Sequence, residues 1–175
     1  MDDTTRAMRF LETGDYRAAE ELLRRILCAE PDSHEVLNKL GICLTWQDRP
    51  DEALECFDRC IAIRPSYPNA YSNKANVLKE KGQLDEALAL YEKALAADAS
   101  YATAYHNLGV LHKQMGHLDK AIPLLKKAAR VSAREVVRGR EGTSRAKTRP
   151  VLPLKYALLL GVLAGLIISI FASRR

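Results

Sequence analysis

The side chains best suited to bind another molecule in this sequence are asparagines spaced to lie on one face of a helix. Asn69, Asn73 and Asn76 follow i, i+4, i+7 spacing, which places them on a single face. An asparagine amide offers one acceptor and two donors, so a row of amides can hold a peptide backbone without reading its side chains. The spacing therefore predicts a peptide-binding surface.

Comparable polar positions recur before and after this row. In the next unit, Asn107 lies on the same predicted helix face as Thr103 and Val110 and is flanked by His106. In the preceding unit, Asn38 accompanies Lys39 and Ile42. We predict a neutral-polar groove whose site residues are Asn38, Asn69, Asn73, Asn76, His106 and Asn107. The alternative is that these asparagines are merely solvated, and loss of partner capture in an Asn73→Ala, Asn107→Ala variant of nearly intact thermal stability would distinguish the two.

The other reactive side chains form no catalytic or metal-binding pattern. The histidines and cysteines lie inside helical patterns without the paired short spacings of zinc ligands, and no glycine-rich phosphate loop is present. They are His34, His106, His112, His117, Cys28, Cys43, Cys56 and Cys60. We therefore predict a protein that is not an enzyme and uses no metal or cofactor, in which the cysteines serve as small buried apolar residues.

A repeat of 34 residues organises most of the chain. Alanines recur in one frame at Ala19, Ala53, Ala87 and Ala121, and turn residues recur in the same frame at Gly14, Asp48, Gly82 and Gly116. Each unit is predicted to be two antiparallel helices joined by that turn. Since one helix pair cannot bury its own apolar face, neighbouring pairs must stack into a solenoid with a continuous core.

The third unit illustrates the apolar faces of such a pair. Its first helix carries Tyr71, Ala75 and Leu78 at i, i+4, i+7 spacing. Its second helix supplies Leu84, Ala87, Leu90, Tyr91 and Leu95. The small alanine lets the two backbones approach, and the large residues fill the space around it.

The stretch LNKLGICL followed by PDEALECFDRCIAIRP resembles the tetratricopeptide repeat (TPR) family in the order of its large, small, aromatic and proline positions. The resemblance covers residues 1–135 and implies an all-α, TPR-type solenoid with units at about 1–33, 34–67, 68–101 and 102–135. The first unit is degenerate because Asp3 and Arg6 stand at apolar places, so we expect it to be an N-terminal cap. His112 stands at a core position of the pattern and is expected to be packed.

The resemblance also implies where a ligand binds, because the first helices of this family line a groove for extended peptides or partner helices. Some members clamp the carboxylate of a chaperone tail. Asn76 and Asn107 match two asparagines of that clamp, but Ser72 stands where a lysine is required. We therefore expect a protein or peptide partner other than a chaperone tail.

Charge is unevenly distributed along the chain. Residues 1–125 carry 15 Lys and Arg against 20 Asp and Glu, whereas residues 126–149 carry 9 against 2. We expect residues 136–153 to form a basic flexible linker with glycines and two prolines. The tract lacks interleaved aromatic residues, so nucleic acid is not an expected partner.

The chain then becomes apolar on every side. No charged residue occurs from Tyr156 to Ser173, and a helix apolar all round is stable only inside a large core or a bilayer. Eighteen residues rise about 27 Å, close to the thickness of a thin hydrocarbon core. We predict a transmembrane helix at residues 154–173, followed by a short basic tail at 174–175.

The flanking charges predict the orientation of this span. Seven Lys and Arg lie between Arg130 and Arg149, and only two follow the span, so the repeat domain is expected to face the cytoplasm. The N-terminus shows no secretory signal, and the layout resembles that of tail-anchored proteins. The membrane would be a bacterial inner membrane or, in a eukaryote, the mitochondrial outer membrane or the endoplasmic reticulum. The basic tract would also attract anionic lipid.

Small residues recur every four positions within the predicted span. Gly161, Gly165 and Ser169 belong to this row, which includes one GxxxG motif. Such a face allows two membrane helices to approach closely. One interpretation is a homodimer contact at this face; the alternative is that glycine is simply common in membrane helices, and Gly161→Ile distinguishes the two.

Two functions fit these features. The first is a membrane-anchored adaptor whose cytoplasmic repeat groove recruits a protein or peptide. The second is a structural assembly factor whose repeats self-associate on a membrane, similar in layout to tail-anchored organelle-fission proteins. A monomeric repeat domain that captures a distinct partner favours the first, and concentration-dependent oligomers without a partner favour the second.

Overall fold

The computed structural model describes residues 2–145, with side chains to residue 137, and this part of the chain contains eight α-helices and no strand. The helices are α1 (Asp3–Thr13), α2 (Tyr16–Ala29), α3 (His34–Trp46), α4 (Pro50–Ile63), α5 (Pro68–Glu80), α6 (Leu84–Ala97), α7 (Ala102–Gln114) and α8 (Leu118–Arg145). One compact unit comprises Met1–Ala133 and a second begins at Arg134.

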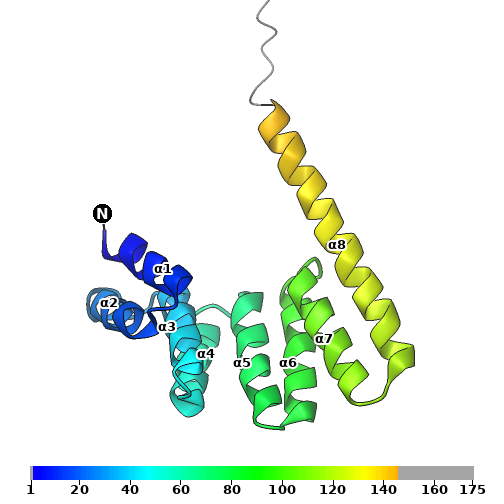
Figure 1. Cartoon of the computed structure of the whole chain (residues 1–175), viewed down its shortest axis with the longest axis horizontal. Helices are drawn as coiled ribbons and strands as arrows, with labels where there is room; N and C mark the ends of the chain where they lie inside the picture. The colour runs from blue at the N-terminus through cyan, green and yellow to red at the C-terminus, as the bar shows by residue number, and fades with distance from the viewer. Residues whose placement is uncertain (1, 146–175) are drawn as a thin grey trace, which may run out of the picture. The chain divides into compact units, whose positions relative to one another are not determined.

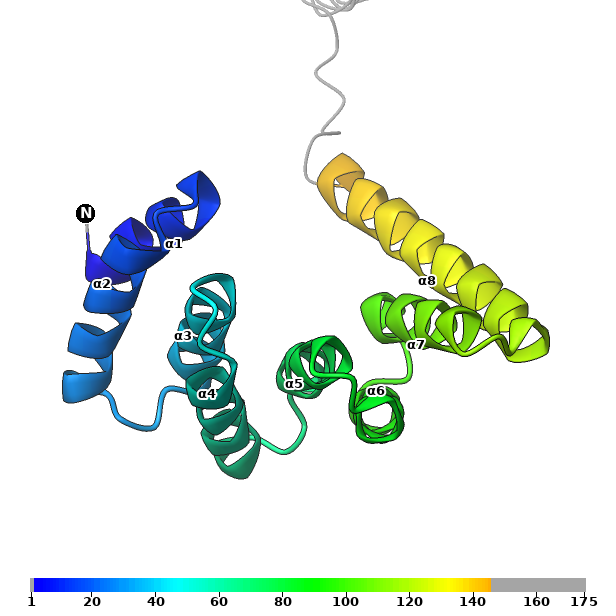
Figure 2. The same ribbon diagram turned by 60° about the horizontal axis from the view of Figure 1, so that its bottom comes forward.

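The helices of the first unit form hairpins that follow one another along the chain (Figures 1 and 2). Each helix from α1 to α6 packs against the next one in sequence, and α3 also contacts α5 as α5 contacts α7. From α3 to α7, the first helices of successive pairs therefore lie side by side. This arrangement confirms the predicted helical-hairpin solenoid.

The four predicted turns all adopt the left-handed backbone conformation. Gly14, Gly82 and Gly116 have φ near +80°, at 79°, 80° and 82°, and Asp48 takes the same role with φ 58°. A non-glycine residue rarely adopts this conformation, and aspartate is among the few that tolerate it. The turn signal of the sequence is therefore confirmed even where the residue is not glycine.

Small residues allow the two helices of each pair to pack closely. Ala19, Ala53 and Ala87 are fully buried and Ala121 is 1% exposed. A Cβ atom added to Gly41 would lie 2.5 Å from Cε1 of Phe57, so a larger residue at this contact between α3 and α4 would force the Phe57 ring to shift. The alanine frame of the sequence thus marks the true helix contacts.

The core also confirms the expected positions of the third unit. Ala75, Leu78, Ala87 and Tyr91 are buried in one cluster, while Leu84, Leu90 and Leu95 are partly buried against it. Tyr71 is half-buried. His112 is 7% exposed, as its place in the repeat predicts.

Helix α8 differs from the expected flexible linker. It runs 28 residues to Arg145, twice the 14 residues of α4 and α6, so residues 136–145 are helical. In the second repeat, Pro65 ends the second helix. In the third repeat, Asp98 ends it by accepting hydrogen bonds from the Ser100 N–H and hydroxyl at 2.8 and 2.7 Å. Ser132 and Ala133 offer neither device, so the helix continues. Residues 146–153 lie outside the described part.

The cysteines divide into two groups. Cys43, Cys56 and Cys60 are buried as predicted, but Cys28 near the end of α2 is exposed. The prediction was wrong for Cys28, which is exposed and lines an open hollow together with residues of α3 and α4. Its helical spacing alone did not identify the exposed side of α2.

The predicted transmembrane helix at residues 154–173 and its Gly161, Gly165 and Ser169 face lie outside the described residues. Among the helices within residues 2–145, none combines the length and apolarity that a bilayer span requires.

Candidate peptide-binding groove

The first helices α3 and α5 enclose a hollow that contains two of the predicted site residues. Its lining comes from the C-terminal part of α3, from the middle and C-terminal part of α5, and from one aromatic residue of α4. The lining residues are Ile42, Thr45, Trp46, Phe57, Asn73, Asn76, Lys79 and Glu80. We name this set the α3–α5 groove.

The predicted asparagines pair with one another across neighbouring helices. Asn73 Nδ2 on α5 donates to Asn38 Oδ1 on α3 at 2.9 Å. Asn107 Nδ2 on α7 donates to Asn76 Oδ1 on α5 at 3.2 Å. Two amide pairs therefore connect three successive first helices, a role that the sequence pattern did not reveal.

A buried tyrosine fixes the orientation of Asn76 from below. Tyr91 on α6 is fully buried, and its hydroxyl donates to Asn76 Oδ1 at 2.5 Å. Burial, with a smaller contribution from the charge of Glu80, raises the pKa of Tyr91 to about 12. The phenol therefore stays protonated near neutral pH and remains a donor to the asparagine.

These contacts leave one polar group free on each of the two asparagines that line the groove. Asn73 uses its amide N–H and Asn76 uses its carbonyl, and within the described residues Asn73 Oδ1 and Asn76 Nδ2 have no hydrogen-bond partner. One acceptor and one donor thus line the groove three residues apart. An extended peptide backbone requires this combination of partners.

The other predicted site residues are not part of this groove. Asn69 lies near the start of α5, where its Nδ2 is 3.5 Å from the Tyr67 hydroxyl. His106 is exposed and lines a different hollow, between α7 and α8. Asn38 is 4% exposed and acts beneath the surface by holding Asn73.

The aromatic edge of the groove was not predicted from the sequence. Trp46 is 67% exposed, and its ring stacks on that of Tyr16 with centroids 5.6 Å apart and planes 4° apart. Lys79 and Glu80 also line the groove but were not predicted. Extending the Asn73–Asn76 stripe by one helical turn reaches them, so the helical spacing contained this signal.

The family profile of the tetratricopeptide repeat matches residues 32–100 and 66–134. The chain belongs to the tetratricopeptide repeat family. TPR proteins mediate protein–protein interaction, and the TPR fold is typically a non-enzymatic scaffold. None of the curated proteins matches the sequence significantly.

Solved structures show the same TPR architecture. The crystal structure of MamA is 25% identical, covers 74% of this chain and 76% of MamA, and has a TM-score of 0.65. The double mutant of MamA from RS-1 is 28% identical over 74% of this chain and 72% of its own, with a TM-score of 0.62. TTC0263, a thermophilic TPR protein of Thermus thermophilus, shares the fold at 24% identity and a TM-score of 0.68, over 74% and 72% of the two chains.

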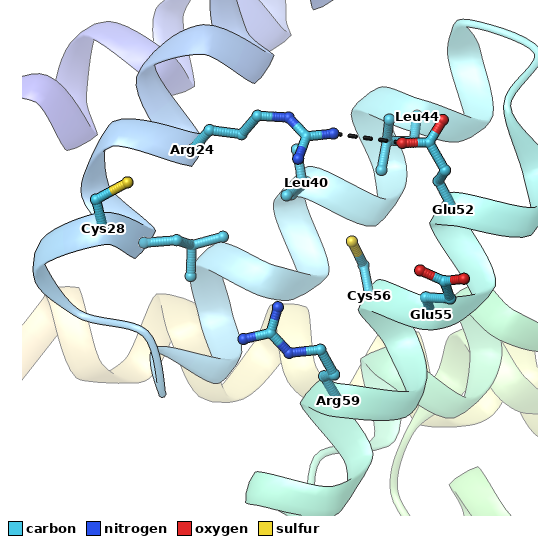
Figure 3. Close-up of a pocket in the computed structure, with 9 residues that line it drawn as sticks. Arg24, Cys28, Leu40, Leu44, Glu52, Glu55, Cys56 and Arg59 are labelled. Atoms are coloured by element: carbon cyan, nitrogen blue, oxygen red, sulfur yellow. Dashed lines mark hydrogen bonds and ion pairs between the residues drawn. The ribbon is translucent and has the colours of Figure 1, made fainter.

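A second hollow lies between α2 and α4, the second helices of the first two repeats (Figure 3). Its polar rim is occupied by an ion pair, since Arg24 Nη2 lies 3.5 Å from Glu52 Oε2. Cys28 and Cys56 line the same hollow. No group of three or more His, Cys, Asp or Glu that could hold a metal occurs within residues 2–145. Because the Arg24–Glu52 ion pair occupies the rim of this hollow, we take the α3–α5 groove as the candidate ligand site.

Proposed function

We propose that this protein is a membrane-anchored adaptor whose α3–α5 groove captures an extended peptide segment of a partner protein. The observation that carries the proposal is the pair of free amide groups on Asn73 and Asn76 beside the exposed ring of Trp46. The amides bind backbone, and the aromatic edge contributes apolar contact area. Lys79 and Glu80 add one charge of each sign at the rim.

The groove can be tested by site-specific photo-crosslinking in cells that express the full chain. A benzophenone side chain placed at Lys79, within the groove, should give a discrete adduct with a partner. The same group at Lys93, an exposed position on α6, is the matched control and should not give that adduct. Identical adducts from both positions would contradict the groove.

Removal of the amides provides the second part of this test. Asn73→Ala with Asn107→Ala should abolish the adduct from position 79, because it removes the Asn73 acceptor from the groove and the hydrogen bond from Asn107 that helps to orient Asn76. The double variant also leaves Asn38 Oδ1 unpaired, which costs about 1–3 kcal/mol of stability. Tyr105→Phe, which removes a hydroxyl bonded to the Ala99 carbonyl, lowers stability without touching the groove and is the control. Adduct formation that survives in the double variant would refute the proposed amide role.

The same experiments separate the adaptor from a self-associating assembly factor. An adaptor gives an adduct with a different protein. An assembly factor gives an adduct of two identical chains and oligomers that grow with concentration. A self-adduct at position 79 would replace the adaptor proposal.

The membrane part of the proposal rests on residues 154–173, which carry one charge, Lys155, in an otherwise apolar stretch. A helix here would hold the repeats at the cytoplasmic face of a bacterial inner membrane or of a eukaryotic mitochondrial or endoplasmic reticulum membrane. The basic residues before it would add attraction to anionic lipid.

Fractionation tests the anchor independently of the groove. The full chain should remain with membranes in alkaline carbonate, and a protease added to the cytoplasmic side should digest the repeats. Release by carbonate would refute the anchor. Replacing Gly161 by Ile should reduce dimers in the membrane if Gly161, Gly165 and Ser169 form a contact face.

A further inference from the structure

Helix α8 exposes aliphatic residues at positions that the preceding repeat partly buries. Leu118 and Ile122 are 54% and 51% exposed. The residues 34 positions earlier, Leu84 and Leu88, are partly buried against the cluster that contains Leu108 of α7. In α6 this face is covered by the first helix of the next repeat.

A hollow continues the same face toward the C-terminal half of α8. It is lined by Ala102, Thr103, His106, Leu125, Ala128, Ala129 and Ser132. Of the seven corresponding residues one repeat earlier, Ser72 is 1% exposed, Tyr91 and Ala94 are fully buried, and the other four are half-buried. Leu118, Ile122, Leu125 and Ala129 follow one helical stripe, so the exposed residues and the hollow form a single surface. We name it the end face.

The end face is open because α8 does not turn back. Where earlier second helices stop before a new first helix, α8 continues to Arg145. No further first helix folds onto α8 within residues 2–145. The surface is therefore shaped by the repeat for a helix that the described part of the chain lacks.

Charges on the end face indicate what that helix should carry. In the second repeat Asp58 on α4 pairs with Lys74 on the next first helix at 2.5 Å, and Asp51 pairs with Lys81 at 2.6 Å. At the same repeat positions α8 carries Lys126, which reverses the first charge, and Asp119, which keeps the second. A complementary helix has an acidic residue followed seven positions later by a basic one.

We propose that the end face docks an amphipathic α-helix of a partner protein, with its acidic residue opposite Lys126 and its basic residue opposite Asp119. A second copy of this chain fits poorly. Its α1 presents Arg6 at the position of Lys74, which would repel Lys126, and Asp3 at a position that is apolar in the later repeats. The end face is separate from the α3–α5 groove, so two partners can bind together.

The test uses a synthetic helix derived from this chain. A fluorescent peptide of residues 101–115, the sequence of the helix that fills the equivalent place on α6, carries Leu108→Glu and Met115→Lys. A control peptide carries Leu108→Lys and Met115→Glu. Fluorescence anisotropy with the full chain in detergent micelles should show about two- to fivefold tighter binding of the first peptide. Equal binding of both peptides, or no binding of either, would overturn the proposal.

Variants of the full chain locate the binding site. Lys126→Glu with Asp119→Lys should reverse the peptide preference. Ile122→Lys, at an exposed position, should weaken both peptides at least about tenfold. Ile63→Lys, at the exposed end of α4, is the matched control and should change neither. The Asn73→Ala, Asn107→Ala variant should bind the peptides normally, which separates this proposal from the groove.

Hydrogen exchange identifies other occupants. Residues 118–128 should exchange faster in the full chain alone than with the first peptide bound. If these residues exchange slowly without peptide, and Ile122→Lys makes them exchange faster, then the chain itself or a second copy covers the end face. That result, with or without concentration dependence, would overturn docking of a partner helix.

Discussion

Arg49 Nη1 lies 2.8 Å from Glu20 Oε2, although the two residues are 29 positions apart in the sequence. Arg49 also pairs with Glu52 at 2.6 Å, and Glu20 accepts from Arg24 and Gln47 at 2.8 Å. Glu20 occupies the repeat position that Leu54 and Leu88 fill in later units. A polar network therefore joins the first repeat to the second at a position that is apolar in the later repeats.

We predict that Glu20→Gln destabilises the fold by about 1–3 kcal/mol, because the Glu20 side chain is only 13% exposed and its donors lose a charged acceptor. Glu52→Gln is the control, since its side chain is 48% exposed and its pairs contribute about 1 kcal/mol or less. Urea denaturation followed by circular dichroism measures both. Equal losses of stability in the two variants would mean that the Glu20 network stabilises the fold no more than the exposed Glu52 pairs do.

The same network predicts a pH dependence. Burial raises the pKa of Glu20, but hydrogen bonds from Arg24, Gln47 and Arg49 outweigh it and hold the pKa below its ordinary value of 4.5. The carboxylate therefore stabilises the fold above pH 4.5 and loses that contribution as the pH falls further. The stability difference between wild type and Glu20→Gln should be constant from about pH 7 to 5 and shrink below about 4.5. A difference that persists unchanged at about pH 3 would contradict this explanation.

We predict that Gly41→Ala destabilises the fold by about 1–3 kcal/mol through overpacking. The added Cβ would meet Phe57 Cε1 at 2.5 Å and Cζ at 2.7 Å, so the Phe57 ring, which is 1% exposed, would have to shift. Phe57→Leu in the Gly41→Ala background should recover part of the loss. Thermal unfolding of the three variants checks this, and a Gly41→Ala protein as stable as wild type would disprove the close contact.

We predict that Tyr91→Phe weakens partner capture as well as stability. The change removes the hydroxyl that orients Asn76 and costs about 0.5–1.5 kcal/mol. Tyr105→Phe loses a comparable bond to the Ala99 carbonyl, away from the α3–α5 groove, and should reduce stability alone. Crosslinking from position 79 distinguishes the two, and equal crosslinking yields would show that Tyr91 does not position the amide.

We predict that one of the four cysteines reacts with iodoacetamide in the folded protein. Cys28 is exposed, whereas Cys43, Cys56 and Cys60 are buried. Burial raises the pKa of Cys43 to about 12 and that of Cys60 to about 11, so these thiols form little thiolate at neutral pH. Mass spectrometry should find a single adduct at Cys28 and four after unfolding. Rapid labelling of Cys43 would indicate that α3 opens readily.

The repeat frame of the sequence predicted the scaffold because sterics at helix contacts leave few choices. Ala53 and Ala87 recur where two helices touch, and Asp48 and Gly82 recur where the chain reverses with positive φ. Each of these constraints acts on a single residue. One sequence with a fixed period is enough to recognise them.

Polar partners were less predictable because they depend on two side chains from different units. The Asn73 and Asn38 pair joins residues 35 positions apart, and the Gln47 and Glu20 pair joins residues 27 apart. Periodicity places such residues on a face but does not say whether they meet. The length of α8 was also not predicted. The helix continues because Ser132 and Ala133 lack the residues that end the earlier second helices, and no helical pattern marks the extension.

Within residues 2–145, the uninterrupted course of α8 also ends the series of helical hairpins. Residues 132–135, Ser-Ala-Arg-Glu, stand where the preceding unit has Asp-Ala-Ser-Tyr and begins a new hairpin. A solenoid of this kind has no intrinsic length, because each unit presents the same surface to the next. Its size is decided where one helix fails to stop. Four residues therefore act as the terminator of a modular array, and restoring the turn sequence there is the natural site at which to lengthen it.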